Sequence, residues 1–117
     1  SGKIVNICSL YSFLGGQRSP AYAATKHGMV GLTKTFCDEL AQYNVQVNGI
    51  APGYFKTKLV EETMNDPERN GWIIGHTPEG RLGDVYDLMG AIIFLASQAS
   101  RFVNGHILAV DGGFLTR

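Results

Sequence analysis

Three short runs of β-branched and apolar residues alternate with longer helical segments, and this alternation restricts the fold more than any other feature of the chain. The predicted strands are Ile4–Cys8, Val45–Ala51 and His106–Val110, and the longer helices are predicted from Ser19 to about Gln42 and from Asp84 to about Ser97. Strands that alternate with helices form parallel sheets, because each helix returns the chain to the starting edge. The sequence therefore predicts an α/β fold in the order β-α-β-(helical insert)-α-β.

Capping residues mark where the helices should begin. Ser19 precedes Pro20, a pair typical of a helix with a serine cap and a proline in its first turn, and Asp84 is the corresponding cap of the later helix. Between the long helices, residues 58–65 are predicted as a short helix. Residues 67–80 mix turn residues with apolar ones, and we interpret them either as a mobile flap over a site or as an ordinary packed loop.

The first long helix carries two glycines, Gly28 and Gly31, at positions where glycine lowers helix stability. Their presence predicts close packing against a neighbouring element. Two apolar lines run along the same helix, which suggests burial against the sheet and against a partner subunit. We therefore expect an oligomer.

The charge balance argues against two broad classes of partner. The chain has 117 residues, with ten acidic and ten basic ones and no basic run, so neither nucleic acid nor an anionic membrane is expected as the main partner. The apolar runs are too short to span a bilayer. Cys8 and Cys37 form neither a disulfide framework nor a metal-ligand cluster, and no metal is expected. Such cysteine usage is typical of the cytoplasm.

Tyr22 and Lys26 are the residues most suggestive of chemistry. Positions four apart share one face of a helix, so the ammonium of Lys26 can lie near the phenol of Tyr22. A free tyrosine is a poor base at neutral pH, but a nearby cation favours the phenolate form. The pair could then exchange a proton with an alcohol or a carbonyl group. Alone, this spacing is a weak signal, and a solvated tyrosine beside a surface lysine is the structural alternative.

The positions of other polar and turn residues strengthen the signal. Ligands of parallel α/β sheets bind at the carboxyl ends of the strands. Ser9 follows the first predicted strand, and Pro52 and Gly53 follow the second. Ser9, at such an end, could hydrogen-bond the same substrate oxygen as Tyr22.

Together these segments resemble the C-terminal half of a short-chain dehydrogenase/reductase, and the resemblance covers essentially the whole chain. Each matching piece is weak, but five in order with family-like spacing are specific. The pieces are Gly2–Ser9, Tyr22–Lys26, Val47–Gly53 followed by Thr57, Gly80–Gly83, and Val103–Gly105 with Val110–Gly113. The resemblance implies that residues 1–117 are the C-terminal, substrate-side half of one doubly wound, Rossmann-like domain.

The resemblance also implies a role for each candidate catalytic residue. Tyr22 would be the general acid or base that moves a proton to or from the substrate oxygen. Lys26 would hold the ribose hydroxyls of the nicotinamide nucleotide and favour the phenolate of Tyr22. Ser9 would orient the substrate oxygen.

A second group of residues would contact the cofactor. Pro52, Gly53 and Phe55 would lie along the nicotinamide, and Thr57 would bond its carboxamide or a phosphate. The structural alternatives are a turn that ends the strand for Pro52 and Gly53, and a helix cap for Thr57.

Within the family, the sequence is most similar to the 2-deoxy-D-gluconate 3-dehydrogenase and gluconate 5-dehydrogenase group, and hence to carbohydrate metabolism. The segments that carry this similarity are Pro52–Tyr54, Thr77–Pro78 with Gly80–Arg81, and Ala109–Phe114. Arg18 could pair with a substrate carboxylate, because guanidinium binds carboxylate bidentately, although a solvated loop arginine is the alternative. A 3-ketoacyl reductase and a non-catalytic, dinucleotide-binding or scaffolding member also remain open. The family suggests a homotetramer.

The glycine-rich dinucleotide turn of the family does not occur in this sequence. In the family, this turn precedes the segment that resembles our chain. The residue that selects NAD or NADP by the ribose 2′ position and the active-site asparagine precede that segment as well. The choice between NAD and NADP is therefore not readable. Because the chain opens with Ser1 and a strand, we expect it to be part of a longer enzyme, and expect the isolated 117-residue chain to be inactive and poorly stable.

Overall fold

The computed structural model describes residues 1–16 and 18–117, and within them the chain forms a parallel sheet between helices. The strands are β1 (Gly2–Ile7), β2 (Val45–Pro52) and β3 (Ile107–Val110), hydrogen-bonded in the order β1-β2-β3 and all parallel. The register sets Ile4 beside Val47 and Ile50 beside Leu108. The strands thus keep the predicted order and direction.

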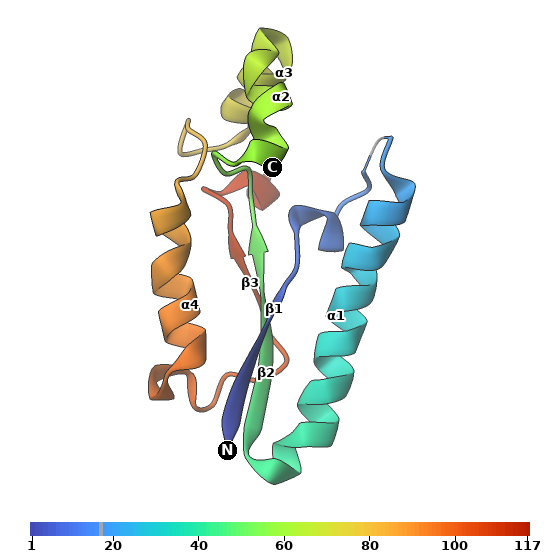
Figure 1. The fold of residues 1–117 in the computed structure, drawn as a ribbon, viewed down its shortest axis with the longest axis vertical. Helices are drawn as coiled ribbons and strands as arrows, with labels where there is room; N and C mark the ends of the chain where they lie inside the picture. The colour runs from blue at the N-terminus through green and yellow to red at the C-terminus, as the bar shows by residue number, and fades with distance from the viewer. Residues whose placement is uncertain (17) are drawn as a thin grey trace.

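Two helices cover opposite faces of this sheet (Figure 1). Helix α1 (Pro20–Leu40) packs mainly on β2, and helix α4 (Met89–Ala96) packs on β1 and β2. Val47, Ile50 and Ala51 of β2 are fully buried between them. The α/β fold and its doubly wound arrangement are therefore confirmed.

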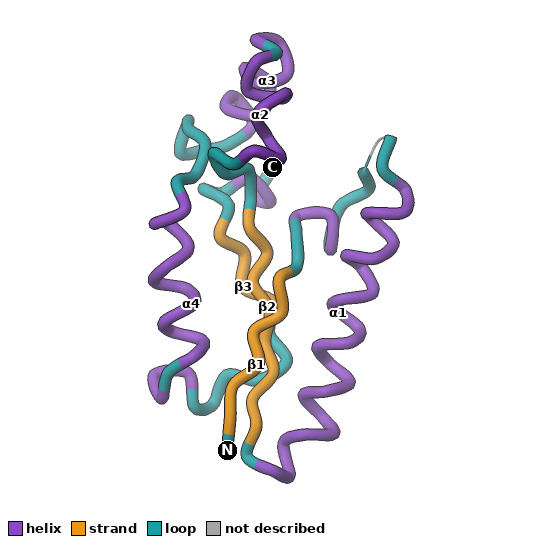
Figure 2. Tube along the Cα trace, in the orientation of Figure 1, coloured by secondary structure: helices purple, strands orange, loops and turns teal. Residues whose placement is uncertain are grey.

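The remaining helices gather at the carboxyl end of the sheet, beside the C-terminus (Figure 1). They are α2 (Glu61–Asn65) and α3 (Pro67–His76). Short 3₁₀ turns lie between the larger elements (Figure 2), at Leu10–Ser12, Ala41–Tyr43, Lys58–Val60, Val85–Leu88, Gln98–Ser100 and Phe114–Thr116. Every helix among the described residues falls short of the length and hydrophobicity that a membrane crossing requires.

Helix α3 corrects the interpretation of residues 67–80 as a flap or loop. The carboxylate of Asp66 accepts hydrogen bonds from the backbone N–H groups of Glu68 and Arg69, and Pro67 occupies the first turn. These features are a helix start. Two glycines within α3 obscured the helical pattern in the sequence, but the burial of Ile73 anchors the helix on the core.

Two details of α1 also differ from the predictions. Ser19 lies at the predicted start, but its side chain makes no capping hydrogen bond. A Cβ atom added to Gly28 or Gly31 would meet nothing within 4 Å among the described residues. Within the described chain nothing packs closely on these glycines, which α1 leaves exposed, and packing against a partner subunit stays a prediction.

Candidate active site

The carboxyl ends of β1 and β2 bring the candidate residues to one edge of the sheet. Strand β1 ends at Ile7, two residues before Ser9, and β2 ends at Pro52. Because β1 and β2 are parallel neighbours, these ends lie side by side. Gly53 is required there sterically, since a Cβ on it would lie 2.8 Å from the Cα of Asp111.

Tyr22 and Lys26 share a face of α1 that is directed at the end of β1. The Nζ of Lys26 donates a hydrogen bond to the carbonyl oxygen of Ile7 at 2.9 Å. The same Nζ lies 5.6 Å from the centroid of the Tyr22 ring, within the range of a cation–π contact. Tyr22 is 41% exposed, so a ligand can approach it. The ammonium is thus fixed between a strand end and the phenol.

Ser9 is held by a small hydrogen-bonded turn. Its Oγ accepts from the backbone N–H of Tyr11 at 3.2 Å, and its own backbone N–H donates to the Oγ of Ser12 at 3.1 Å. A hydroxyl offers one donor as well as its acceptor lone pairs. The capping interaction uses only acceptor capacity, which leaves the Ser9 proton free to be donated to a substrate oxygen.

A pair of hydrogen-bonded tyrosines lies beside this group. The rings of Tyr11 and Tyr22 meet edge to face with centroids 5.7 Å apart. The hydroxyl oxygens of Tyr11 and Tyr54 are 3.0 Å apart. Burial raises the pKa of Tyr54, and the hydrogen bond with Tyr11 raises it further, so Tyr54 remains a neutral phenol at ordinary pH. Tyr54 directly follows the Pro52–Gly53 turn, so the pair bridges the ends of β1 and β2.

The tyrosine pair lines a pocket of about 820 Å³. The lining comes from the segment after β1, from Tyr54, from α3 and its cap, and from the C-terminal turn. It consists of Leu10, Tyr11, Leu14, Gly15, Arg18, Ser19, Tyr54, Asp66, Glu68, Arg69, Trp72, Ile73 and Phe114. A volume of this size fits a small-molecule site with an aromatic wall and a few polar groups.

The structure places the remaining predicted residues in different surroundings. Arg18 lines the large pocket and is exposed, with its backbone at a φ of 63°. Phe55 is buried and pairs with Gly83 through an isolated parallel bridge. Thr57 occupies the cap position of the 58–60 turn without a side-chain hydrogen bond, so its exposed hydroxyl is not used as a cap.

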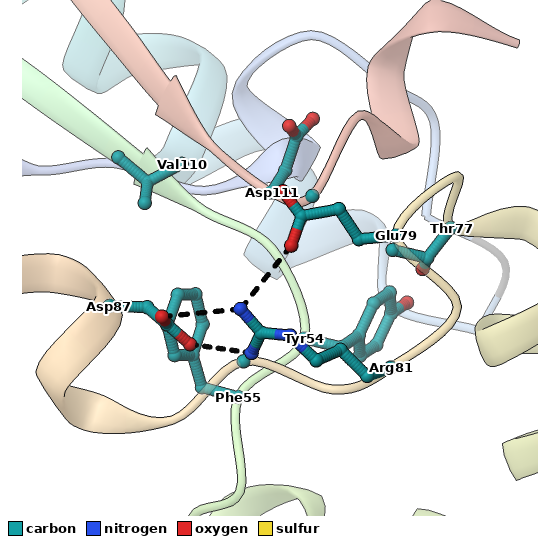
Figure 3. Close-up of a pocket in the computed structure, with 10 residues that line it drawn as sticks. Tyr54, Phe55, Thr77, Glu79, Arg81, Asp87, Val110 and Asp111 are labelled. Atoms are coloured by element: carbon teal, nitrogen blue, oxygen red, sulfur yellow. Dashed lines mark hydrogen bonds and ion pairs between the residues drawn. The ribbon is translucent and has the colours of Figure 1, made fainter.

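A second cavity, of about 170 Å³, is lined by Phe55, Arg81 and Asp87 among other residues (Figure 3). Arg81 donates to both carboxylate oxygens of Asp87, at 2.7 Å and 3.3 Å, and pairs with Glu79 at 3.3 Å. These contacts tie residues 79–87 together and hold Gly83 against the Phe55 ring. We interpret this cavity as part of the scaffold, because Arg81, Glu79 and Asp87 pair with one another and the Asp111 carboxylate accepts from the backbone N–H groups of Gly113 and Leu115.

Sequence reasoning did not assign roles to Tyr11, Arg69 or Trp72, all of which line the large pocket. Tyr54 and Phe114 entered only as parts of subgroup segments. The position of Arg69 depends on α3, which was not predicted. Tyr11 could have been found from its place two residues after Ser9.

Comparison with known proteins identifies the family. A protein-family model described as enoyl-(acyl carrier protein) reductase matches residues 1–115. The chain therefore belongs to this family, a branch of the short-chain dehydrogenase/reductases. The resemblance read from the sequence is thus confirmed.

The similar proteins form a narrower group. The chain is 62% identical to an uncharacterized oxidoreductase of Escherichia coli (strain K12), YgcW, over all 117 of its residues and 45% of that protein. It is 53% identical to 2-dehydro-3-deoxy-D-gluconate 5-dehydrogenase of Bacillus subtilis (strain 168), covering 99% of the chain and 46% of that enzyme. The chain spans about half the length of the curated relatives it matches.

A solved structure has the same fold over the same region. A gluconate 5-dehydrogenase from Burkholderia cenocepacia J2315, in complex with NADP and tartrate, superposes with a TM-score of 0.97 at 49% identity. The match covers 99% of this chain and 46% of that one. The parallel sheet and the helices at its carboxyl end are thus shared with a nucleotide-binding member of the family.

Proposed function

We propose that this chain is the C-terminal, substrate-side half of a short-chain dehydrogenase/reductase that uses NAD or NADP. The reaction would interconvert a secondary alcohol and a ketone, with Ser9, Tyr22 and Lys26 as the catalytic group. The observation that carries the proposal is the contact of Lys26 with both the end of β1 and the Tyr22 ring. The proposal that this chain is one half of a longer enzyme is supported by the relatives, which are about twice as long.

The residues of the chain divide the chemistry among them. Tyr22 would give its proton to the carbonyl oxygen in reduction, or remove the alcohol proton in oxidation. Lys26, held by the Ile7 carbonyl, would keep positive charge beside the Tyr22 ring. Ser9 would donate its free proton to the same substrate oxygen and fix its position. When bound, the nicotinamide supplies or accepts the hydride.

The end of β2 fits such a cofactor. Lys26 would donate to the ribose hydroxyls, and Thr57 has an exposed hydroxyl that the local helix cap does not use. Gly53 lets Asp111 pack closely against the end of β2, and Pro52 and Phe55 flank the same turn. The NADP in the gluconate 5-dehydrogenase structure supports a nicotinamide nucleotide here, while the choice between NAD and NADP stays open.

A sugar acid is the substrate class that the comparisons favour. The Bacillus and Burkholderia relatives are named for gluconate derivatives, and the latter structure contains tartrate, a hydroxylated diacid. The pocket supplies two phenols for hydroxyl groups and arginines, including Arg18, for a carboxylate. A 3-ketoacyl reductase is the second candidate, because the same sequence segments serve both reactions in the family and the family model is named for an acyl-chain substrate. The mixed polar lining of the pocket favours the sugar acid.

The change Tyr22→Phe tests the catalytic reading in the full-length protein. It keeps the ring and removes only the oxygen that carries the proton, so turnover should fall by about 10²–10⁴-fold while binding of the reduced nucleotide (NADH or NADPH), measured by its fluorescence, is retained. Tyr43→Phe is the matched control. Tyr43 is 64% exposed and lies in the turn after α1, at the opposite end of that helix from Tyr22. Unchanged turnover in Tyr22→Phe would leave the catalytic role of Tyr22 without support, whereas a non-catalytic scaffold would show no turnover in the wild type.

Substrate class is tested by comparing gluconate and 5-ketogluconate with a 3-ketoacyl thioester. Turnover of the sugar acids alone supports the proposal, and turnover of the thioester alone supports the acyl reductase.

A homotetramer in the cytoplasm is part of the same proposal. Exposed apolar side chains on α1, such as Leu32 and Phe36, support contact with further protein surface.

A further inference from the structure

The large pocket contains charged groups whose roles differ. It is lined by Arg18, Asp66, Glu68 and Arg69. The Asp66 carboxylate is already engaged, because it caps α3 by accepting from the Glu68 and Arg69 N–H groups at 3.2 Å and 3.3 Å. Its negative charge is thus partly satisfied by the helix start. The arginines are the groups in this pocket suited to an anion.

Arg69 is the better-positioned of the two arginines. Its backbone is fixed in the first turn of a ten-residue helix by the Asp66 cap, whereas Arg18 lies in a loop with a left-handed backbone. Among the described residues, the ion pairs found are those of Arg81, so no carboxylate of this part of the chain lies within ion-pairing distance of the Arg69 guanidinium. Its positive charge also acts on the neighbouring Tyr54 phenol.

We propose that Arg69 is a specificity-determining residue that binds the carboxylate of the substrate, with the Tyr11–Tyr54 pair between it and the reacting end at Tyr22. This inference rests on the proposed function and adds to it the residue that selects acids over neutral polyols. The pocket connects these groups: Tyr54 and Arg69 both line it, and Tyr11 contacts both Tyr54 and the Tyr22 ring.

The tyrosine pair adds recognition of hydroxyl groups. One of the two phenol protons is used in the 3.0 Å hydrogen bond between Tyr11 and Tyr54. The other is left to donate to a substrate oxygen, and the phenol oxygens can accept from substrate hydroxyls. A polyhydroxylated acid would therefore meet a guanidinium at its carboxylate and phenols along its chain. Guanidinium binds carboxylate through two parallel hydrogen bonds.

The test compares D-gluconate with D-glucitol, which carries CH₂OH in place of the carboxylate. Binding to the NADP-loaded full-length protein is followed by the fluorescence of Trp72, which lines the same pocket, with Trp72→Phe used to subtract other signals. Arg69→Gln should weaken gluconate binding by about 10- to 100-fold, the effect of losing a hydrogen-bonded charge, and leave glucitol binding unchanged. Arg69→Lys should recover part of the loss.

Two further variants sharpen the test. Glu68→Gln removes the competing negative charge and should tighten gluconate binding. Arg101→Gln is the matched control, because Arg101 is exposed and does not line the pocket, and it should change nothing. The inference would be overturned if Arg69→Gln changed the affinity for gluconate by less than about twofold, or if it weakened the binding of gluconate and glucitol equally. Absence of turnover in the wild type with selective gluconate binding intact would refute the proposed function alone.

Discussion

Gly83 has no room for a side chain, and replacing it tests how the Phe55 segment is held. A Cβ added to Gly83 would lie 2.5 Å from Cε1 and 2.7 Å from Cδ1 of the Phe55 ring. Gly83 is not among the glycines with positive φ, so an alanine would suffer no backbone strain, only this contact. Phe55 is 6% exposed, and its ring cannot move outward without losing buried contacts.

We expect Gly83→Ala to destabilise the full-length protein by about 1–3 kcal/mol, the usual range for overpacking a core. Denaturant unfolding measures the change. The cost should be less in a Phe55→Leu background, so a double-mutant cycle should show at least about 0.5 kcal/mol of coupling. NADP affinity should fall as well, because the bridge between Phe55 and Gly83 positions the segment that leads to Thr57.

Gly71→Ala is the matched control for this experiment. Gly71 lies within α3, and an added Cβ would meet no atom of the described chain within 4 Å. Alanine should therefore stabilise the helix there by about 0.5–1 kcal/mol. Equal effects of the two substitutions, or additive effects of Gly83→Ala and Phe55→Leu, would refute the steric argument.

Three other predictions follow from buried and paired groups. Asn48→Leu should destabilise the protein by about 1–3 kcal/mol for each group left unpaired, since Asn48 donates to the Val103 carbonyl and accepts from the His106 N–H, both at 2.9 Å; an unfolding midpoint unchanged from wild type would contradict this. Arg81 lowers the pKa of Asp87 to about 2, so the contribution of this pair to the folded state is complete above pH 4 and is lost as the pH falls toward 2. Asp87→Asn should remove this pH-dependent part of the unfolding free energy. Identical stability-versus-pH curves for the wild type and Asp87→Asn would contradict the prediction. The isolated 117-residue chain should melt without cooperativity and bind a hydrophobic dye, and a cooperatively melting monomer would refute that expectation.

The sequence predicted the strands and long helices because their signals are local. Pro20 lies in the first turn of α1, and Asn44 in a left-handed conformation ends the 3₁₀ turn Ala41–Tyr43 that follows α1. Asp84 caps the 3₁₀ turn Val85–Leu88, which leads into α4, through the Tyr86 N–H. In each case one or two neighbouring residues decide the boundary, so a single sequence contains the information.

The missed features depend on residues far apart in the chain. Helix α3 contains two glycines and a histidine that weaken its local pattern. It is stabilised by the burial of Ile73 and by the contacts of Trp72 and His76 with the distant Phe114 ring, at centroid distances of 6.1 Å and 5.1 Å. The contact of Tyr11 with Tyr54 joins positions 43 residues apart. Spacing along the sequence could place Tyr22 with Lys26, but it could not show which aromatic residues complete the pocket.

The parallel sheet explains why the candidate chemistry converges although its residues are scattered. Every parallel strand ends at the same edge, so the ends of β1, β2 and β3 deliver Ser9, Tyr54 and the turn before Phe114 to one place. Tyr54 and Phe114 have ring centroids 5.6 Å apart, which joins the end of β2 to that of β3. Helix α3 closes the pocket over these strand ends, and a change in α3 can alter which substrate fits without moving Tyr22 or Lys26. In the proposed function, proton transfer and substrate selection would therefore reside on separate elements, the first on α1 and the segment after β1 and the second on α3.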